Sequence, residues 1–152
     1  MVNRVGIIAA VVVGMAAFCL TAAAEDAAYI GSQKCMKCHF KEHATWKKEK
    51  HAVAYETIAK EADKELCVSC HTTGYGKGGF KDMESTPELA NVGCEACHGA
   101  GSKHAAAMDE IKKAGGEVTE DAKSLIAQKP TDCSTCHNPH VQDTAAHARE
   151  KK

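Results

Sequence analysis

One short pattern occurs four times along the chain: two cysteines separated by two residues, with a histidine directly after the second cysteine. The copies span 35–39, 67–71, 94–98 and 133–137 of the 152 residues. Two thiols three positions apart can each form a thioether with one vinyl group of the same porphyrin, and the imidazole that follows can then bind its iron. This is the attachment motif of c-type haem. The sequence therefore predicts four covalently bound haem c groups with their iron.

The motifs assign two sets of residues. The thioether-forming residues are Cys35, Cys38, Cys67, Cys70, Cys94, Cys97, Cys133 and Cys136. The first axial ligands of the irons are His39, His71, His98 and His137.

Three other uses of paired cysteines explain less of this pattern. Eight cysteines in an exported chain can form disulfides, but neither the uniform spacing nor the histidines follow from that. Two pairs can also build a four-thiolate zinc site, which again leaves the histidines without a role. A thioredoxin-like redox pair needs a βαβ pattern around it, and no motif here has one.

The N-terminus has the features of a secretory signal peptide over residues 1–24. Arg4 gives the positive start, Val5–Leu20 the apolar stretch, and Ala22–Ala24 the small residues of the cleavage site. The alternative is an uncleaved membrane anchor, because about 20 apolar residues can span a bilayer. Cys19 lacks the small preceding residue of a lipoprotein signal, so we assign it to the removed segment. We expect a periplasmic or extracellular protein with no stable membrane span after cleavage.

Residues 25–152 are predicted to form one tetrahaem cytochrome c domain. These 128 residues (152 minus 24) are poor in large aliphatic side chains, so we expect the four haems themselves to form the core. The haem-free chain should then be largely unfolded. Cleavage removes Arg4 and leaves 18 basic against 20 acidic side chains, so the charge does not indicate a nucleic-acid partner.

The segments between the motifs favour helices, and no alternating strand pattern occurs. The segment 42–66 lacks Gly and Pro and predicts one helix. A second helix is predicted with Ser102 as its cap, running to Ala114 before two glycines, and a third from Thr119 to near Pro130. Residues 86–88 predict a short helix with proline in its first turn. The glycine-rich run 73–80 predicts a loop whose backbone approaches a porphyrin closely. The expected fold class is mostly α with long irregular loops, a small multihaem cytochrome fold.

Five further histidines can supply the second axial ligands: His43, His51, His104, His140 and His147. His43 follows His39 by four positions, so both lie on one helix face and cannot bind opposite sides of one haem. His140 is similarly close to the fourth motif. We therefore expect distal ligands to come from other parts of the chain, with His51 and His104 as the leading candidates. Methionine is an alternative ligand, and Met83 and Met108 are available.

The chain resembles the multihaem cytochrome c-554 family (cytochrome c-554/c-prime) in more than its haem motifs. It has Trp46 five residues before His51, the run 70–80 with its glycines, and the run 93–99 followed by His104. The resemblance covers residues 29–104 and, more loosely, the fourth motif.

This resemblance implies a haem-packed helical fold whose bis-histidine haems pass electrons in periplasmic respiration. It implies that His104 is the distal ligand of the first-motif haem and His51 that of a later haem. In the ammonia-oxidiser members the second-motif haem lacks a distal ligand. The chain departs from the family by ending soon after the fourth motif, and by its His43 and His140, which are not recognised family ligands. They are candidates to complete the ligand sets here.

Our leading hypothesis is an electron carrier rather than an enzyme, which exchanges electrons with redox protein partners. All-histidine ligation predicts low reduction potentials. The first alternative is a haem enzyme that reduces a small nitrogen compound at a five-coordinate iron. The second is a subunit of an extracellular conducting filament, a homopolymer, because the resemblance extends to tetrahaem cytochromes that polymerise.

Overall fold

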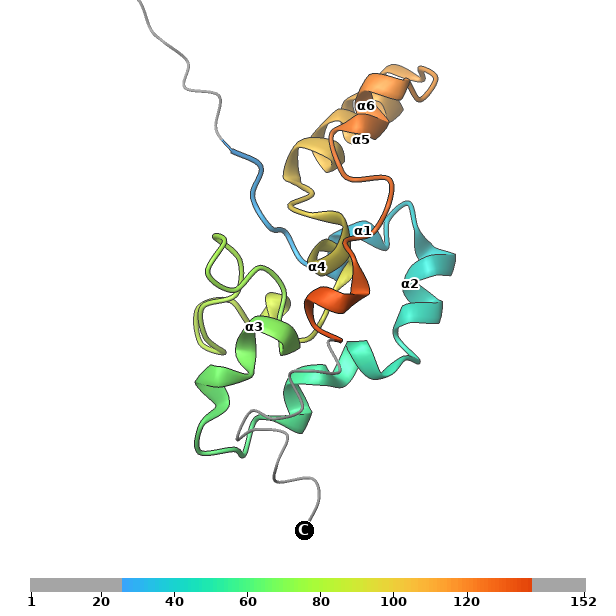
Figure 1. Cartoon of the computed structure of the whole chain (residues 1–152). Coiled ribbons are helices and arrows are strands. Elements are labelled where there is room, and N and C mark those ends of the chain that lie inside the picture. The colour runs from blue at the N-terminus through green and yellow to red at the C-terminus, as the bar shows by residue number, and fades with distance from the viewer. Residues whose placement is uncertain (1–25, 138–152) are drawn as a thin grey trace, which may run out of the picture.

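The computed structural model describes residues 26–137. The signal peptide expected over 1–24 and the candidate ligands His140 and His147 lie outside the described residues. Short helices joined by long irregular loops make up the described chain (Figure 1). The α-helices are α1 (Ser32–Cys35), α2 (Phe40–Trp46), α3 (Val68–His71), α4 (Cys94–His98), α5 (Ser102–Ala114) and α6 (Glu120–Ser124). The 3-10 helices are η1 (Lys50–Thr57), η2 (Lys64–Leu66), η3 (Pro87–Leu89) and η4 (Cys133–Thr135).

The mostly helical fold class with irregular loops is confirmed. Within residues 26–137 the β-type pairing is limited to one isolated antiparallel bridge between Thr72 and Ala90. No helix in this part of the chain combines the length and the apolar character that crossing a bilayer requires.

The longest helix of the described residues, α5, ends where the sequence predicts. It ends at Gly115, whose left-handed backbone (φ 64°) lets its N–H bond back to the carbonyl of Lys112. Its N-cap is Gly101 rather than Ser102. α6 begins as expected after Thr119, whose hydroxyl accepts the N–H of Ala122, but it is only five residues long. The two helices pack against each other as a hairpin that projects from the rest of the molecule (Figure 1).

The single helix expected over 42–66 is wrong, because α2 ends at Trp46 and the chain continues as the 3-10 helices η1 and η2. η1 itself contains a kink, where Val53 has non-helical backbone angles (φ −127°, ψ 18°). A sequence without Gly or Pro permits a long helix but does not enforce one.

Tertiary hydrogen bonds from residues 91–92 hold this segment in its broken form. The backbone N–H of Val92 donates to the carbonyl of His51 (3.0 Å), and the Nε1–H of Trp46 donates to the carbonyl of Val92 (2.9 Å). The side chain of Asn91 accepts the N–H of Tyr55 (2.8 Å). Since a continuous helix would use these backbone groups internally, the bonds to 91–92 compete with it.

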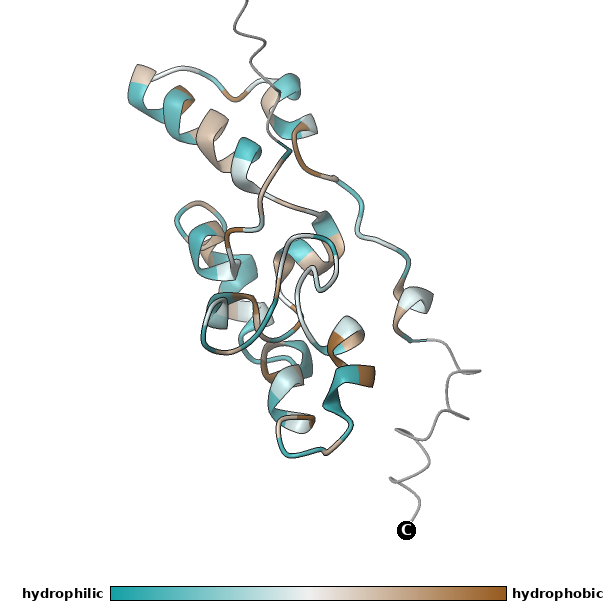
Figure 2. Cartoon of the chain, turned by 90° about the vertical axis from the view of Figure 1, so that its left-hand side faces the viewer, coloured by the Kyte–Doolittle hydropathy of each residue, from teal (hydrophilic) through white to brown (hydrophobic). Residues whose placement is uncertain are grey.

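The apolar core is small and lies around α3. Its buried members are Ile58, Val68, Phe80 and Leu89, and the rings of Phe80 and Tyr55 lie 5.5 Å apart between centroids. Within residues 26–137, only two further apolar side chains are buried, Ala54 and Ala122. Figure 2 shows the hydrophobic residues scattered over separate parts of the ribbon. Such a core contributes little of the apolar burial that usually offsets the entropy of folding.

The glycine-rich run 73–80 forms a loop, and two of its glycines lie close to other parts of the protein. Gly74 lies against the ring of Tyr29, where an added Cβ would come within 2.6 Å of the ring, and Gly79 lies against the loop's own backbone. Gly74 also has φ 72°, which a residue with a Cβ rarely adopts. The close backbone approaches of Gly74 and Gly79 are therefore to protein atoms, and they bring the loop over the small core.

Candidate haem-binding site

Each of the four motifs folds into one helical turn. In the first, second and fourth motifs the histidine N–H donates to the carbonyl of the first cysteine, with N···O distances of 2.9, 3.1 and 2.8 Å. The third motif is the helix α4 itself. One helical turn places residues three and four apart on the same face. Both thiols and the imidazole of a motif are thus presented to the same side, as attachment to one porphyrin requires.

The first motif is paired with helix α5. The ring centroids of His39 and His104 lie 6.4 Å apart, with their planes inclined by 28°. His39 follows α1, and His104 lies in the first turn of α5, so the pair joins two segments 65 positions apart (104 minus 39). The structure therefore brings the motif histidine beside the histidine that the family resemblance names as its partner.

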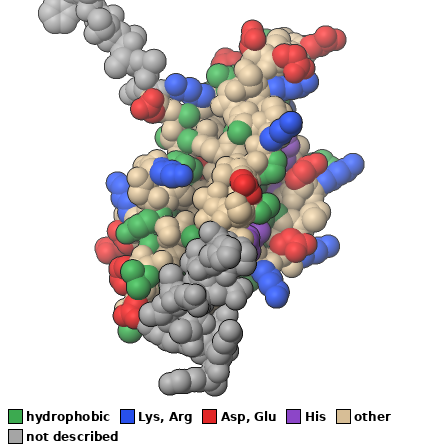
Figure 3. All heavy atoms as spheres, viewed as in Figure 1, with side chains coloured by type: hydrophobic (Ala, Val, Ile, Leu, Met, Phe, Trp, Pro, Cys, Tyr) green, Lys and Arg blue, Asp and Glu red, His purple; other side chains and the backbone are tan. Residues whose placement is uncertain are grey.

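The fourth motif is paired with η1. The Nε2 atoms of His51 and His137 lie 3.4 Å apart, and their ring centroids 5.7 Å apart. Two imidazole nitrogens that bound one metal from opposite sides, each at about 2 Å, would lie about 4 Å apart. Both rings present Nε2, the atom left for a metal when Nδ1 is used elsewhere. Figure 3 shows histidine atoms between α2 and the segment that leads to η4.

Three imidazoles are oriented by backbone carbonyls. The Nδ1 atoms of His71, His98 and His104 each lie 2.8 Å from a carbonyl oxygen, those of Ala54, Ala127 and Ala122 respectively. A carbonyl oxygen only accepts, so these contacts place the ring proton on Nδ1. Nε2 is then unprotonated, which is the form that binds a metal, and the bond fixes the direction of the ring.

His43 occupies a different position from the other candidate ligands. It is buried in α2, with its ring 5.3 Å from that of Trp46. Within the described residues it makes no ring contact with a motif histidine. His71 and His98 also lack a ring contact with a second histidine in this part of the chain.

The thiols of different motifs lie close to one another. Cys35 of the first motif donates a hydrogen bond to Cys94 of the third, which lowers the pKa of Cys94 to about 6 and raises that of Cys35. Burial and the nearby thiols of Cys70 and Cys97 raise the pKa of Cys136 to about 11. Burial, followed by the charges of Cys133 and Cys94, raises the pKa of Cys97.

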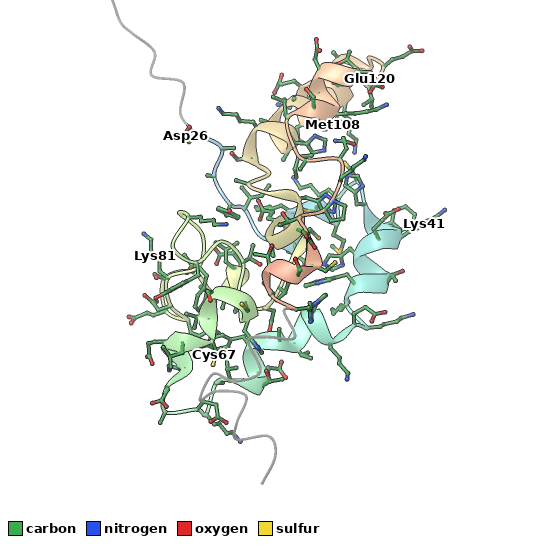
Figure 4. All side chains as sticks on the ribbon, viewed as in Figure 1. Asp26, Lys41, Cys67, Lys81, Met108 and Glu120 are labelled. Atoms are coloured by element: carbon green, nitrogen blue, oxygen red, sulfur yellow. The ribbon has the colours of Figure 1, made fainter. Side chains whose placement is uncertain are left out.

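These contacts define an order among the motifs. The first adjoins the third, the third adjoins the fourth, and the fourth adjoins the second. The packing of α1 against α4 agrees with the first of these neighbours. Figure 4 shows the side chains crowded between these helices, whereas Lys41 points outward from α2 and Cys67 lies at the start of α3.

The described residues form neither disulfides nor a four-thiolate zinc site. None of the eight cysteines in residues 26–137 is in a disulfide. Nor does this part of the chain contain a group of three or more His, Cys, Asp or Glu side chains arranged around one metal ion, as a four-thiolate zinc site requires. The residues fit haem instead, since each motif offers two thiols and an imidazole on one face.

Sequence reasoning assigned no role to Glu95, which lies between the cysteines of the third motif. It is only 1% exposed, and its carboxylate accepts N–H groups of Ile30, Gly31 and Gly101. The sequence feature that could have indicated it is an acidic residue at a variable position of an attachment motif, with glycines nearby on both sides.

Four single-turn attachment motifs in a small helical fold with little apolar core define a multihaem c-type cytochrome, a class of electron-transfer proteins. Residues 34–99 match the family described as "Cytochrome c554 and c-prime". The curated cytochrome c-554 of Nitrosomonas europaea is 32% identical over 161 aligned positions, which cover 86% of this chain and 67% of the relative.

The structural comparison gives the same relationship. The solved structure described as the reduced state of cytochrome c554 from Nitrosomonas europaea aligns with a TM-score of 0.53 at 31% identity, and the alignment covers 74% of this chain and 66% of that one. The chain thus spans about two thirds of the length of both relatives. It belongs to the cytochrome c-554 family, and its cofactor is covalently bound haem c with iron.

Proposed function

We propose that the chain is an exported tetrahaem electron carrier whose haems have mainly two histidine ligands. The observation that carries this proposal is the pairing of histidines from distant segments, His39 with His104 and His51 with His137. A second imidazole on each iron leaves no position for a substrate. This arrangement favours electron transfer over catalysis at those two irons.

Bound haem supplies a one-electron change between ferric and ferrous iron. The chain's contribution is to keep the ligands in place in both states. The carbonyls of Ala122, Ala127 and Ala54 hold the imidazoles of His104, His98 and His71 in fixed directions. Fixed ligands change little between oxidation states, and histidine ligands without methionine favour low reduction potentials.

The order of the motifs suggests a path through the protein. The contacts between thiols run from the first motif through the third and fourth to the second. We infer that electrons enter at one end of this series and leave at the other. Redox proteins are the expected partners at both ends.

Export rests on the N-terminal segment. We propose that residues 1–24 are a cleaved signal peptide and that residues 25–152 form the mature domain in the periplasm or outside the cell. The features that support this are Arg4, the apolar stretch Val5–Leu20 and the alanines before Glu25. Thioether attachment to reduced thiols after export is consistent with eight cysteines in an oxidising compartment.

The direct test uses the purified full-length gene product. Haem counting by absorbance of the pyridine adduct should give four groups per chain, as the four motifs require. A reductive titration should show several overlapping steps at low potential. A colourless protein, or a single step at high potential, would contradict the proposal.

A second candidate function is reduction of a small nitrogen compound at an open iron. The specific observation in its favour is that neither His71 nor His98 contacts a second histidine ring within residues 26–137. His43, His140 and His147 are the remaining candidates for those irons. Carbon monoxide binding by the native reduced protein, or a high-spin ferric signal, would favour the enzyme. A wholly low-spin spectrum without carbon monoxide binding would favour the carrier.

The molecular mass in solution distinguishes a filament subunit from the electron carrier and the enzyme. Light scattering on the purified protein should give the mass of one chain with its haems. A polymer would instead support the conducting filament, in which case haems of neighbouring subunits would have to lie close together.

A further inference from the structure

Glu95 is one of the most completely buried side chains in residues 26–137. It is 1% exposed although it is a carboxylate, and it lies in α4 directly after the first cysteine of the third motif. Neither ion pair among the described residues includes it. A buried charge without an ionic partner is costly unless hydrogen bonds satisfy it.

Backbone N–H groups from two other segments satisfy this carboxylate. Its Oε2 accepts the N–H of Gly31 (2.7 Å), its Oε1 accepts that of Gly101 (2.7 Å), and both oxygens lie 3.0 Å from the N–H of Ile30. Every one of these partners is a donor. The site therefore accommodates the ionised carboxylate, which only accepts, and not a neutral amide that would direct an N–H toward another N–H.

The two segments that bond to Glu95 lead to the two histidines of the proposed His39–His104 pair. Ile30 and Gly31 lead into α1 and so into the first motif, which ends at His39. Gly101 is the N-cap of α5, and His104 lies three residues further on. Glu95 makes no hydrogen bond to either histidine, but its hydrogen bonds connect the backbone segments that carry both.

Neighbouring bonds strengthen this junction. Ser32 accepts the N–H of Cys94 (3.0 Å), and Ser102 and Ala28 exchange two bonds (2.8 and 3.1 Å). The approach at Gly101 depends on its lack of a side chain, because an added Cβ would lie 3.2 Å from Oε1 of Glu95. Three segments thus meet at one carboxylate, beside two haem attachment turns.

We propose that Glu95 is a positioning residue for the His39–His104 pair and that its buried negative charge lowers the reduction potentials of the first-motif and third-motif haems. The physical reason is that a fixed negative charge in a poorly screened site favours the more positive ferric state. The inference rests on the proposed function, because it requires haem at these motifs. It adds a residue that sets both the geometry and the energy of electron transfer.

The test compares three variants of the haem-loaded full chain. Glu95→Gln removes the charge and keeps the length, whereas Glu95→Asp keeps the charge and shortens the reach. Glu88→Gln is the matched control, because Glu88 is an exposed carboxylate whose side chain lies near the same Gly31. Redox titration gives the potentials, and electron paramagnetic resonance of the ferric protein gives the ligand state.

Glu95→Gln should raise the reduction potential of at least one haem by ~59 mV. At a fixed applied potential this corresponds to a roughly tenfold higher ratio of reduced to oxidised haem, for one electron. Glu95→Asp should leave the potentials within about twofold in that ratio and alter the low-spin ferric signal of one haem. Glu88→Gln should change neither. Unmoved potentials in Glu95→Gln, or equal shifts in Glu95→Gln and Glu88→Gln, would overturn the electrostatic role.

A further variant covers the case in which Glu95→Gln fails to load haem. Gly101→Ala keeps the charge and crowds only the junction, so it should perturb the low-spin signal with little change in potential. An unchanged signal would overturn the positioning role. The haem count of the wild-type chain is measured first: a wild type without haem refutes the proposed function, whereas a tetrahaem wild type with unaffected variants refutes only the role of Glu95.

Discussion

His51 and His137, which are 86 positions apart, bring their Nε2 atoms within 3.4 Å of each other. His51 lies in η1, and His137 is the last residue of the fourth motif. Neither segment is helical over more than a few turns, so the contact depends on how the chain is folded back rather than on local structure. This contact is the main support for our proposal that one part of the chain supplies the second axial ligand of a haem attached to another part.

Substitution of His51 by alanine should leave the iron of the fourth-motif haem five-coordinate. With one imidazole removed, one haem of the four should become high-spin in the ferric state and bind carbon monoxide when reduced. Lys50→Gln, a change at the exposed neighbouring position, is the control. A wholly low-spin spectrum in His51→Ala would show that another residue completes this iron.

Substitution of His104 by alanine should open the first-motif haem in the same way. Lys103→Ala, an exposed change on the same turn of α5, should leave the spectrum unchanged. Because the two ligand pairs are separate, the double variant His51→Ala/His104→Ala should bind two equivalents of carbon monoxide. A single equivalent in the double variant would mean that both histidines serve one iron.

Removal of the haems should unfold most of the chain. A variant with all eight motif cysteines changed to serine keeps the described apolar core, but that core has only four members. Such a core cannot offset the conformational entropy of a hundred or so ordered residues. Circular dichroism should show little helix and no cooperative melting, in contrast to the haem-loaded protein. Cooperative melting of the serine variant would contradict this account.

The mature N-terminus should be Glu25. Intact-mass measurement of the exported protein should give the mass of residues 25–152 plus four haems. Retention of residues 1–24 with haem attached would instead indicate a membrane anchor, and the protein would then fractionate with membranes.

The surface around the first motif should attract anions. Residues 34–50 carry six lysines and two glutamates, all exposed, although the whole chain is close to neutral. We therefore expect oxidation of the reduced protein by ferricyanide to slow as ionic strength rises. Lys41→Gln/Lys48→Gln should slow it by at least about twofold at low salt. The control Lys60→Gln/Lys112→Gln removes the same charge elsewhere and should slow the oxidation less. With a cationic cobalt oxidant, Lys41→Gln/Lys48→Gln should not slow the oxidation.

Local features of this fold could be predicted from the sequence, and long-range ones could not. The end of α5 at Gly115 and the cap of α6 at Thr119 depend on residues within one turn, and both were anticipated. The segment 42–66 was not, because its form depends on hydrogen bonds from residues 91–92 that no local pattern reveals.

The same division applies to the site. The attachment turns follow from the spacing of cysteines and histidine, which is local. The resemblance to the family named His104 as partner of the first motif, and the structure brings His104 beside His39. The resemblance did not specify which later haem His51 serves. Glu95 could not be singled out from the sequence, because its hydrogen bonds are with backbone groups distant along the chain or in the loop that follows α4.

The contact between Cys35 and Cys94 has a consequence for biogenesis. These sulfurs belong to different attachment motifs, yet the folded chain brings them within hydrogen-bonding reach, with Cys94 poised as a thiolate. In an oxidising compartment such a pair is prone to cross-link, which would block both from receiving their prosthetic groups. If the chain is exported as we propose, thioether formation therefore has to precede folding, with a reductant keeping each cysteine reduced until it has reacted with its vinyl group.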